Sequence, residues 1–158
     1  SLREGIRSHR NFQDFHLHME FKLAYMPAAR GQGRSNSGCY MQGRYEVQIL
    51  DSPWGPADHR ECGAIYGVAP PRVNAARESQ RWQSYLIHFQ QPLFDETETK
   101  SSPAVLTVYH NGILIHDQQP VGFSTGSGKA ELPGPAPLLL QDHGNLVRFR
   151  NIWWVPLS

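Results

Sequence analysis

Two features that would indicate a membrane or nucleic-acid partner are missing from this sequence. No stretch approaches the roughly 20 consecutive apolar residues that span a bilayer, and apolar residues make up only 39% of the chain. The 15 basic and 14 acidic residues give a formal net charge of +1, and no run of Lys or Arg stands out. We therefore expect no membrane insertion and no binding of nucleic acid through a positive field.

Cysteine is also scarce. Cys39 and Cys62 are the only two, which allows one disulfide in an oxidising compartment or, equally, two free buried thiols. The chain opens on Ser1 rather than Met, and its first residues, SLREGIRSHRN, are polar. They do not resemble a signal peptide, so we expect the chain to be a fragment or a processed product.

Helical periodicity is weak throughout, and alternation of apolar and polar residues dominates instead. Only VNAARESQRW, residues 73–82, indicates a short helical turn. In FHLHMEFKL, residues 15–23, the odd positions are apolar, whereas His16, His18 and Glu20 would share the opposite face. This pattern predicts a half-buried strand, and residues 84–89, SYLIHF, predict another.

Two β-hairpins are predicted farther along the chain. Residues 104–117 contain Asn111-Gly112, which favours the positive φ angles of a tight turn, and residues 137–155 would fold back around His143-Gly144-Asn145. Loops rich in Pro, Gly and Ser separate the predicted strands, at 27–38, 52–61, 90–103 and 118–137. We expect a single all-β domain over 1–158, an antiparallel sandwich or jelly roll.

The stretch GRYEVQILDS, residues 43–52, carries the first candidate site. In a strand, Glu46 and Gln48 would share one face, and Asp51 would join them only if a bulge intervenes. The spacing resembles the Glu-x-Asp-x-x-Glu strand of laminarinase and lichenase type β-glucanases, in which two carboxylates flank the glycosidic bond. Here, however, Gln48 cannot ionise and Asp51 is one carbon shorter than Glu.

Three other groups of residues have candidate chemistry. His16, His18 and Glu20 offer two imidazoles and a carboxylate, which could bind a divalent cation or form an ordinary polar strand face. ARGQGRSNSG, residues 29–38, contains Gly-x-Gly without a following helix, so it predicts a loop carrying Arg34 and Asn36 to a pocket rim. His143, next to Asp142, suits either proton abstraction or turn formation.

Five blocks in order resemble the 3-keto-disaccharide hydrolase domain family, from about Ile6 to Pro156. They are RSNSGCYMQGRYEVQILDS, ECGAIYG, VNAA, YHNGILIHD and LLLQDHGNLVRFRNIWW. The resemblance implies a concanavalin A-like jelly roll of two antiparallel sheets. Members of the family usually carry a further Trp-containing segment before GIRS, so we expect this chain to lack an N-terminal strand segment.

The resemblance further implies cleavage of a glycoside whose sugar is already oxidised to a ketone at C3. Removal of the C2 proton gives an enolate, which expels the glycosidic oxygen from C1 before water adds. On this hypothesis His143 is the base, oriented by Asp142 or Gln141, and Glu46 binds hydroxyls or donates a proton. Arg150 or Arg34 would stabilise the enolate oxygen, and Tyr66 or Trp82 would stack on the sugar ring. The sugar hydroxyls would contact Gln48, Asn36 and Glu20. Asp51 also stands at a position expected in the family.

Two other functions remain open on the sequence. The first is a non-catalytic, lectin-like carbohydrate-binding module. It remains open because the jelly-roll fold occurs in lectins as well as in enzymes. The second is a direct-displacement glucanase, which requires Glu46 and Asp51 to converge. No cofactor is indicated beyond the open possibility of a cation near His16. The family resemblance implies a periplasmic or extracellular location and an oligosaccharide or glycoside partner.

Overall fold

The computed structural model describes residues 3–157, and nearly all of its regular structure is β. Within those residues the only helix is a 3-10 turn, η1 (Gly31–Gly33). The strands are β1 (Arg3–Phe12), β2 (Phe15–Leu23), β3 (Ser37–Met41), β4 (Tyr45–Ile49), β5 (Trp82–Gln90), β6 (Leu93–Phe94), β7 (Lys100–Ser102), β8 (Ala104–His110), β9 (Ile113–Val121), β10 (Ala136–Asp142) and β11 (Val147–Pro156).

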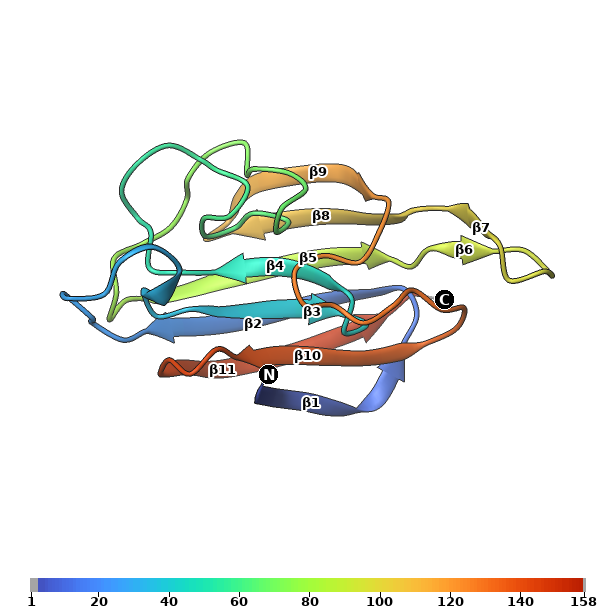
Figure 1. Ribbon diagram of the computed structural model, residues 1–158, viewed down its shortest axis with the longest axis horizontal. Helices are drawn as coiled ribbons and strands as arrows, with labels where there is room; N and C mark the ends of the chain where they lie inside the picture. The colour runs from blue at the N-terminus through green and yellow to red at the C-terminus, as the bar shows by residue number, and fades with distance from the viewer. Residues whose placement is uncertain (1–2, 158) are drawn as a thin grey trace.

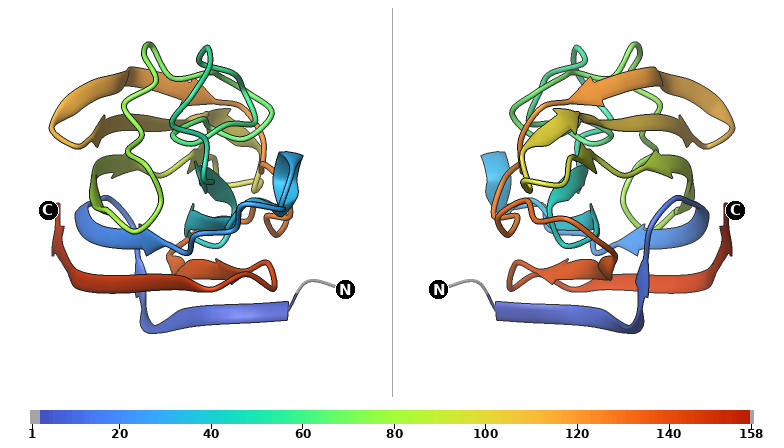
Figure 2. Two further views of the ribbon diagram at one scale, coloured as in Figure 1. Left: turned by 90° about the vertical axis from the view of Figure 1, so that its left-hand side faces the viewer. Right: turned by 90° about the vertical axis from the view of Figure 1, so that its right-hand side faces the viewer.

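The strands form two main antiparallel sheets, which lie one behind the other (Figure 1). The four-stranded sheet has the order β1-β10-β3-β4, and the five-stranded sheet has the order β11-β2-β5-β8-β9. Strands β6 and β7 make a small separate ribbon. The views along the strands show the two layers from both ends (Figure 2). The predicted jelly-roll sandwich is confirmed.

Side-chain alternation places the hydrophobic core between the sheets. The odd residues of β2, from Phe15 to Leu23, are at most 1% exposed, and its even residues face away from the core. From the facing sheet, Tyr45, Val47 and Ile49 of β4 enter the same core. Each such side chain stabilises the fold by roughly 1.5–3 kcal/mol relative to full exposure. The predicted strand at 15–23 is therefore confirmed, with its buried face as expected.

The predicted hairpin at 104–117 is also confirmed. Strands β8 and β9 pair from His110 opposite Ile113 onward, and Asn111 and Gly112 have φ angles of 52° and 80°. Asn111 also accepts a hydrogen bond from the backbone N–H of Ser84 (3.0 Å). The turn residue thus also fixes the position of the neighbouring strand β5.

The predicted hairpin at 137–155 is wrong. Strand β10 pairs with β1 and β3, whereas β11 pairs with β2 in the other sheet. The turn after β10 therefore carries the chain from one sheet to the other. Gly144, with φ of 84°, permits a sharp reversal in either case, so the turn residues alone do not select the partner strand.

The predicted helical turn at 73–82 is wrong as well. Residues 74–78 have no regular structure, and β5 begins at Trp82. The Gln83 side chain accepts a hydrogen bond from the Arg77 N–H (2.9 Å) and donates one to the Arg77 carbonyl (3.1 Å). These bonds replace the partners that the Arg77 backbone would find in a helix.

Both cysteines are buried and free, so the free-thiol alternative holds. Burial raises the pKa of the Cys62 thiol to about 11, and its sulfur lies 3.4 Å from the Tyr85 hydroxyl. Over residues 3–157, no helix has both the length and the apolar character needed to cross a membrane.

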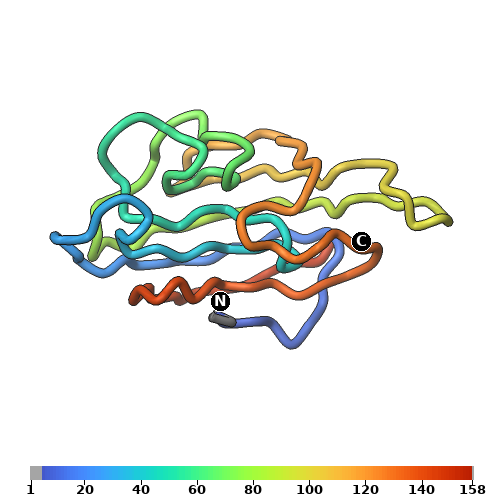
Figure 3. The backbone as a smooth tube through the Cα atoms, in the orientation of Figure 1, coloured from blue at the N-terminus to red at the C-terminus, as the bar shows by residue number. Residues whose placement is uncertain are grey.

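Two loop segments complete the layer that contains the four-stranded sheet. Residues 63–66 run along the free side of β4: Gln48 donates its N–H to the Ala64 carbonyl (2.9 Å), and Tyr66 donates to the Glu46 carbonyl (3.2 Å). The segment 122–135, between β9 and β10, crosses the front of the β3–β4 region (orange in Figure 3). These two segments cover what would otherwise be an open sheet edge and face.

Candidate functional site

The site is built on the outer face of β3, β4 and β10. On β4, Tyr45, Val47 and Ile49 point into the core, so Glu46 and Gln48 point outward. Across the strand pair, Tyr40 is opposite Glu46 and Gly38 is opposite Gln48. Since directly opposite side chains in antiparallel strands lie close together, these polar groups form one cluster.

This face of β4 is buried. Glu46 is 3% exposed and Gln48 is 1% exposed. The segment 122–135 packs against Glu46, whereas the Gln48 side chain donates to Gln32 and to the Arg60 carbonyl. Thr125 accepts a hydrogen bond from the Glu46 N–H (2.8 Å), and Ser127 donates its N–H to the Tyr40 hydroxyl (3.3 Å). The loop predicted at 118–137 therefore forms part of the site.

The Glu46 carboxyl group is packed between two glycines. A Cβ atom added at Gly38 or at Gly126 would lie less than 3.0 Å from a carboxylate oxygen of Glu46. Burial raises the pKa of Glu46 to about 7, although the hydrogen bond from the Tyr40 hydroxyl (2.7 Å) opposes that shift. A carboxyl with this pKa can act as either acid or base near neutral pH.

The Tyr40 hydroxyl links Glu46 to the rest of the site. It donates to Glu46, and it lies within hydrogen-bond distance of the Gln141 amide nitrogen (3.3 Å) and the Ser127 N–H. Burial and the neighbouring Glu46 charge raise the pKa of Tyr40 well above its usual range. The phenol consequently stays protonated and is available as a hydrogen-bond donor.

These groups open into a pocket of about 200 Å³. His143, on the turn after β10, lines the same pocket as Glu46, although the two residues are 97 positions apart in the sequence. The Gln141 amide oxygen is buried and has no hydrogen-bond partner among the described residues. The full lining consists of Gln32, Asn36, Tyr40, Glu46, Gln48, Tyr66, Gly126, Ser127, Gln141 and His143.

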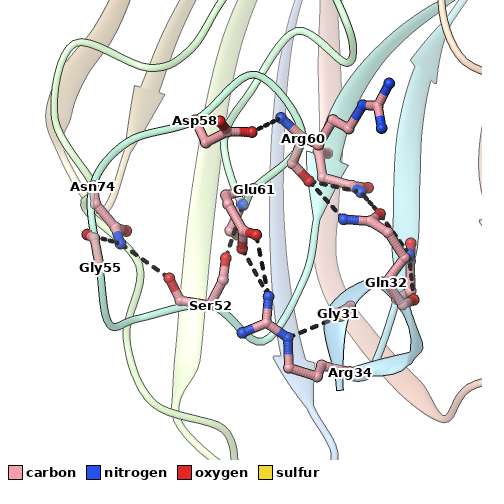
Figure 4. A network of polar contacts seen from close by, with 12 residues as sticks. Gly31, Gln32, Arg34, Ser52, Gly55, Asp58, Arg60, Glu61 and Asn74 are labelled. Carbon is pink, nitrogen blue, oxygen red and sulfur yellow. Dashed lines mark hydrogen bonds and ion pairs between the residues drawn. The ribbon is translucent and has the colours of Figure 1, made fainter. Parts of the chain in front are cut away.

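A network of amides supports one wall of the pocket. Gln32, the central residue of the 3-10 turn η1, accepts hydrogen bonds from the side-chain nitrogens of Gln48 (2.9 Å) and Asn36 (3.1 Å) through its amide oxygen. Its own nitrogen donates to the Arg60 carbonyl (3.0 Å), which ties the two loops together (Figure 4). Amide groups of this kind are suited to binding sugar hydroxyls, because they both donate and accept hydrogen bonds.

Residues 3–155 match the family profile described as the 3-keto-alpha-glucoside-1,2-lyase-like domain. The chain belongs to this family. The resemblance that the five sequence blocks indicated is thus confirmed over nearly the whole chain.

Three similar crystal structures each carry the description "putative glycosyl hydrolase from Parabacteroides distasonis ATCC 8503". The first is 32% identical, with a TM-score of 0.86, and the match covers 96% of this chain and 67% of that one. The second is 18% identical (TM-score 0.68, 96% and 76% covered) and the third 24% identical (TM-score 0.66, 98% and 83% covered). The last two show the shared fold alone. A comparison with curated proteins gives no match.

Within this lyase-like domain, two predicted residues lie beside the pocket rather than in it. Arg34 forms an ion pair with Glu61 (2.9 Å), visible in Figure 4. Asp51 lines a different cavity together with Arg34 and Trp54, and burial raises its pKa. Glu46 and Asp51 therefore do not converge in one pocket, and the carboxylate pair required by a displacing glucanase is not formed.

Three further predicted residues belong to the five-stranded sheet instead. Glu20 of β2 and Arg150 of β11 form an ion pair (2.5 Å), and the Arg150 guanidinium lies 3.9 Å from the centre of the Trp82 ring. The hydrogen bond from Arg150 lowers the pKa of Glu20. This cluster connects neighbouring strands on the outer face of that sheet, so the structure does not place Glu20, Arg150 or Trp82 in the pocket with Glu46.

The histidines of β2 also contact neighbouring residues on the outer face of the five-stranded sheet. His16 stacks on His88 with 3.9 Å between ring centres, and burial, followed by the charge of His16, lowers the pKa of His88. His18 lies 3.0 Å from the Asn151 carbonyl through Nδ1. Across residues 3–157 no group of three or more His, Cys, Asp or Glu side chains is placed to bind a metal ion.

Asp142 does not orient His143. Its Oδ1 accepts a hydrogen bond from the Gly144 N–H (2.8 Å) and so closes the turn, and Asp142 is not among the residues that line the pocket. Gln141, the other predicted orienting residue, does line the pocket. Because adjacent residues of a strand point to opposite faces, β10 can direct only one of these two side chains toward Glu46.

No role was predicted from the sequence for Tyr40, Gln32, Gly126 or Ser127. For Tyr40 a signal was present, because Gly38 and Tyr40 alternate with the apolar Cys39 and Met41 just as Glu46 and Gln48 alternate on the next strand. Gly126 and Ser127 lie about 80 residues after Glu46 in a loop without periodicity. Their position follows from the tertiary structure alone.

Proposed function

We propose that this domain cleaves glycosides whose sugar ring carries a ketone at C3, by eliminating the glycosidic oxygen across C1 and C2. The observation that supports this most strongly is the placement of His143 and a buried Glu46, whose pKa is about 7, in one polar pocket. The family description names a 1,2-lyase-like domain, and the 32% identical protein is described as a glycosyl hydrolase candidate. A carbohydrate substrate agrees with both.

The first step is removal of the C2 proton. The C3 ketone acidifies this hydrogen, and the imidazole of His143 accepts it, leaving an enolate across C2 and C3. Negative charge develops on the ketone oxygen, so donors are needed around it. The side-chain amide of Gln141 lies on the pocket wall and, besides the N–H directed to Tyr40, has a second N–H for this purpose.

The second step breaks the C1–O bond. The enolate electrons form a C1=C2 double bond while the glycosidic oxygen departs and takes a proton from the hydrogen-bonded pair of Tyr40 and Glu46. With a pKa of about 7, Glu46 still carries a proton in about half of the molecules at neutral pH. Addition of water across the double bond then yields the 3-keto-sugar.

The size of the pocket limits what it encloses. Its volume of about 200 Å³ is below the roughly 300–1,000 Å³ typical of sites for drug-sized ligands. One sugar ring would fit among the amides of Asn36 and Gln48, with Tyr66 as a ring-stacking partner. The leaving group would then lie outside this pocket, so the domain would act on one terminal oxidised sugar.

The proposal is tested by offering a 3-keto-glycoside and its unoxidised parent to the wild type, His143→Ala and Glu46→Gln. We expect the wild type to cleave only the keto form, and each variant to lose at least about 100-fold in kcat/KM, as is typical for loss of a general acid or base. His9→Ala is the matched control, because His9 is exposed and outside the pocket. Equal cleavage of both substrates by the wild type would refute the elimination route.

The same experiment separates an enzyme from a lectin-like module. The amides of Gln32, Gln48 and Asn36 would bind sugar hydroxyls in either case. Binding of the 3-keto-glycoside, measured by calorimetry, without any cleavage by the wild type would establish a binding module and refute the proposed activity.

A further inference from the structure

A second cavity adjoins the sugar pocket on the same face of the four-stranded sheet. Its volume is about 460 Å³, more than twice that of the sugar pocket. The two cavities share Tyr40, Ser127 and Gln141 as lining residues. We refer to this second cavity as the apolar chamber, and the Tyr40 hydroxyl stands on the boundary between the two.

The strand register shows how the chamber continues from the site. Arg7 of β1 is opposite Leu139 of β10, Leu139 is opposite Tyr40 of β3, and Tyr40 is opposite Glu46 of β4. These four residues thus form one row across the sheet. At about 4.8 Å between neighbouring strands, the row extends roughly 14 Å from Glu46 to Arg7. A ligand bound at Glu46 can therefore continue over Leu139 without leaving the sheet face.

The lining of the chamber differs chemically from that of the sugar pocket. Leu139 forms part of its floor, and Leu132, Pro135 and Pro137 contribute from the segment before β10 and from its start. No Asp or Glu lines it. The sugar pocket, in contrast, is lined mainly by amides, hydroxyls and Glu46.

Most polar groups of the chamber are already bonded or exposed; the buried Gln141 amide oxygen, at the boundary with the sugar pocket, is the exception. Arg44 donates to the Leu132 carbonyl (2.8 Å) and to the Gln42 amide oxygen (3.1 Å), and Gln42 donates to the Phe12 carbonyl (2.8 Å). Arg7 and Lys129 are exposed, and their side chains form no ion pair among the described residues. A second sugar would bring many hydroxyls to a wall with few free partners, which is unfavourable.

We propose that the apolar chamber binds the leaving group of the glycoside, and that this group has an apolar ring rather than a second sugar. This inference rests on the proposed function. The C1–O bond would lie beside Tyr40, so the departing oxygen takes the Tyr40 proton and Glu46 returns a proton to Tyr40. The C2 proton goes to His143 in the same reaction, so the elimination step releases an alcohol and leaves a 1,2-unsaturated 3-keto-sugar, to which water then adds.

The test compares three 3-keto-glucosides, each as both anomers, whose leaving groups are methanol, benzyl alcohol and a second glucose. All three leaving groups are alkyl alcohols, which keeps differences in intrinsic reactivity small. We expect the wild type to cleave the benzyl compound with a kcat/KM at least about tenfold above that of the disaccharide, a factor typical of one well-filled apolar subsite.

Two variants and one control assign that preference to the chamber. Leu139→Asn and Leu132→Asn should each lower the ratio of benzyl to methyl cleavage by about tenfold. Leu93→Asn, at an exposed leucine of β6 outside both cavities, should leave the ratio unchanged. Leu132 is 60% exposed, so we expect Leu132→Asn to fold. This variant therefore tests the leaving-group assignment even if Leu139→Asn fails to fold.

The outcomes distinguish this inference from the proposed function. Cleavage of the methyl compound, with the benzyl compound no better than the disaccharide, would overturn the leaving-group assignment and leave the elimination intact. An unchanged benzyl-to-methyl ratio in both folded variants would overturn it too. Failure of the wild type to cleave any of the three compounds would overturn both.

Discussion

Replacing the buried carboxyl of Glu46 with an amide should make the protein more stable in alkaline solution. Burial raises the pKa of Glu46 from its ordinary 4.5 to about 7, so the folded state binds more protons than the unfolded state between these values. Stability therefore falls as pH rises from about 4.5 to about 7. At about 1.4 kcal/mol per pKa unit, the ionised carboxylate destabilises the fold by about 3 kcal/mol above neutral pH.

Glu46→Gln removes this effect because the amide does not ionise, and its oxygen can still accept the hydrogen bond from Tyr40. The stability of the variant relative to the wild type should increase by about 2–3 kcal/mol between pH 5 and pH 8. Urea unfolding at both pH values measures this difference, with Glu96→Gln, which removes an exposed carboxylate, as the control.

The result that would refute the reasoning is a Glu46→Gln stability difference that does not change with pH. That outcome would mean that Glu46 ionises equally easily in the folded and unfolded states, and hence that its site is hydrated. A parallel loss of catalysis and gain of alkaline stability in Glu46→Gln would instead indicate that the fold is destabilised by a group retained for chemistry.

Three further outcomes are expected. Gly126→Ala should reduce cleavage at least about tenfold, because the new Cβ would clash with the buried Glu46 carboxylate. Gly134→Ala, also at a positive φ but with open space around it, should leave cleavage unchanged. The kcat/KM values of the two variants test this, and equal losses would show that backbone strain is the cause. Arg150→Ala should leave kcat/KM within about twofold and change stability little, as for other exposed ion pairs, and a large loss of activity would instead support its predicted role at the sugar. Cys39 and Cys62, both buried and free, should react with a thiol reagent only after unfolding, and rapid reaction of the native protein would contradict their burial.

The fold was predictable where a single strand carries its own information. The alternation in residues 15–23 specified the buried face of β2, and Asn111-Gly112 specified the turn between β8 and β9. The turn at His143 was located correctly, but its strands were wrongly paired with each other. Turn residues determine where the chain reverses, whereas the partner of each strand depends on distant segments.

In the candidate site, too, the features that one strand determines were predictable and those that depend on distant segments were not. Glu46 and Gln48 were assigned to one strand face by period-two alternation, and the structure places them there. Their burial was not predictable, because it depends on separate loops. Glu46 is covered by a loop about 80 residues later that contains Thr125, and Gln48 contacts Gln32 and Arg60. Glu20 was grouped with Glu46 although it lies on the other sheet, because polar alternation marks an outward face but does not distinguish the two outward faces of a sandwich.

The central claim is that His143 and Glu46 carry out an elimination that begins at C2 of a 3-keto-sugar. It is tested most directly with a 3-keto-glycoside carrying deuterium at C2, incubated in ordinary water, and a parallel sample without protein to correct for spontaneous exchange. Mass spectrometry of the released sugar at early times should show that the deuterium has been lost to solvent. A released sugar that retains its deuterium would contradict the claim, because the bond to C1 would then have broken without proton removal at C2.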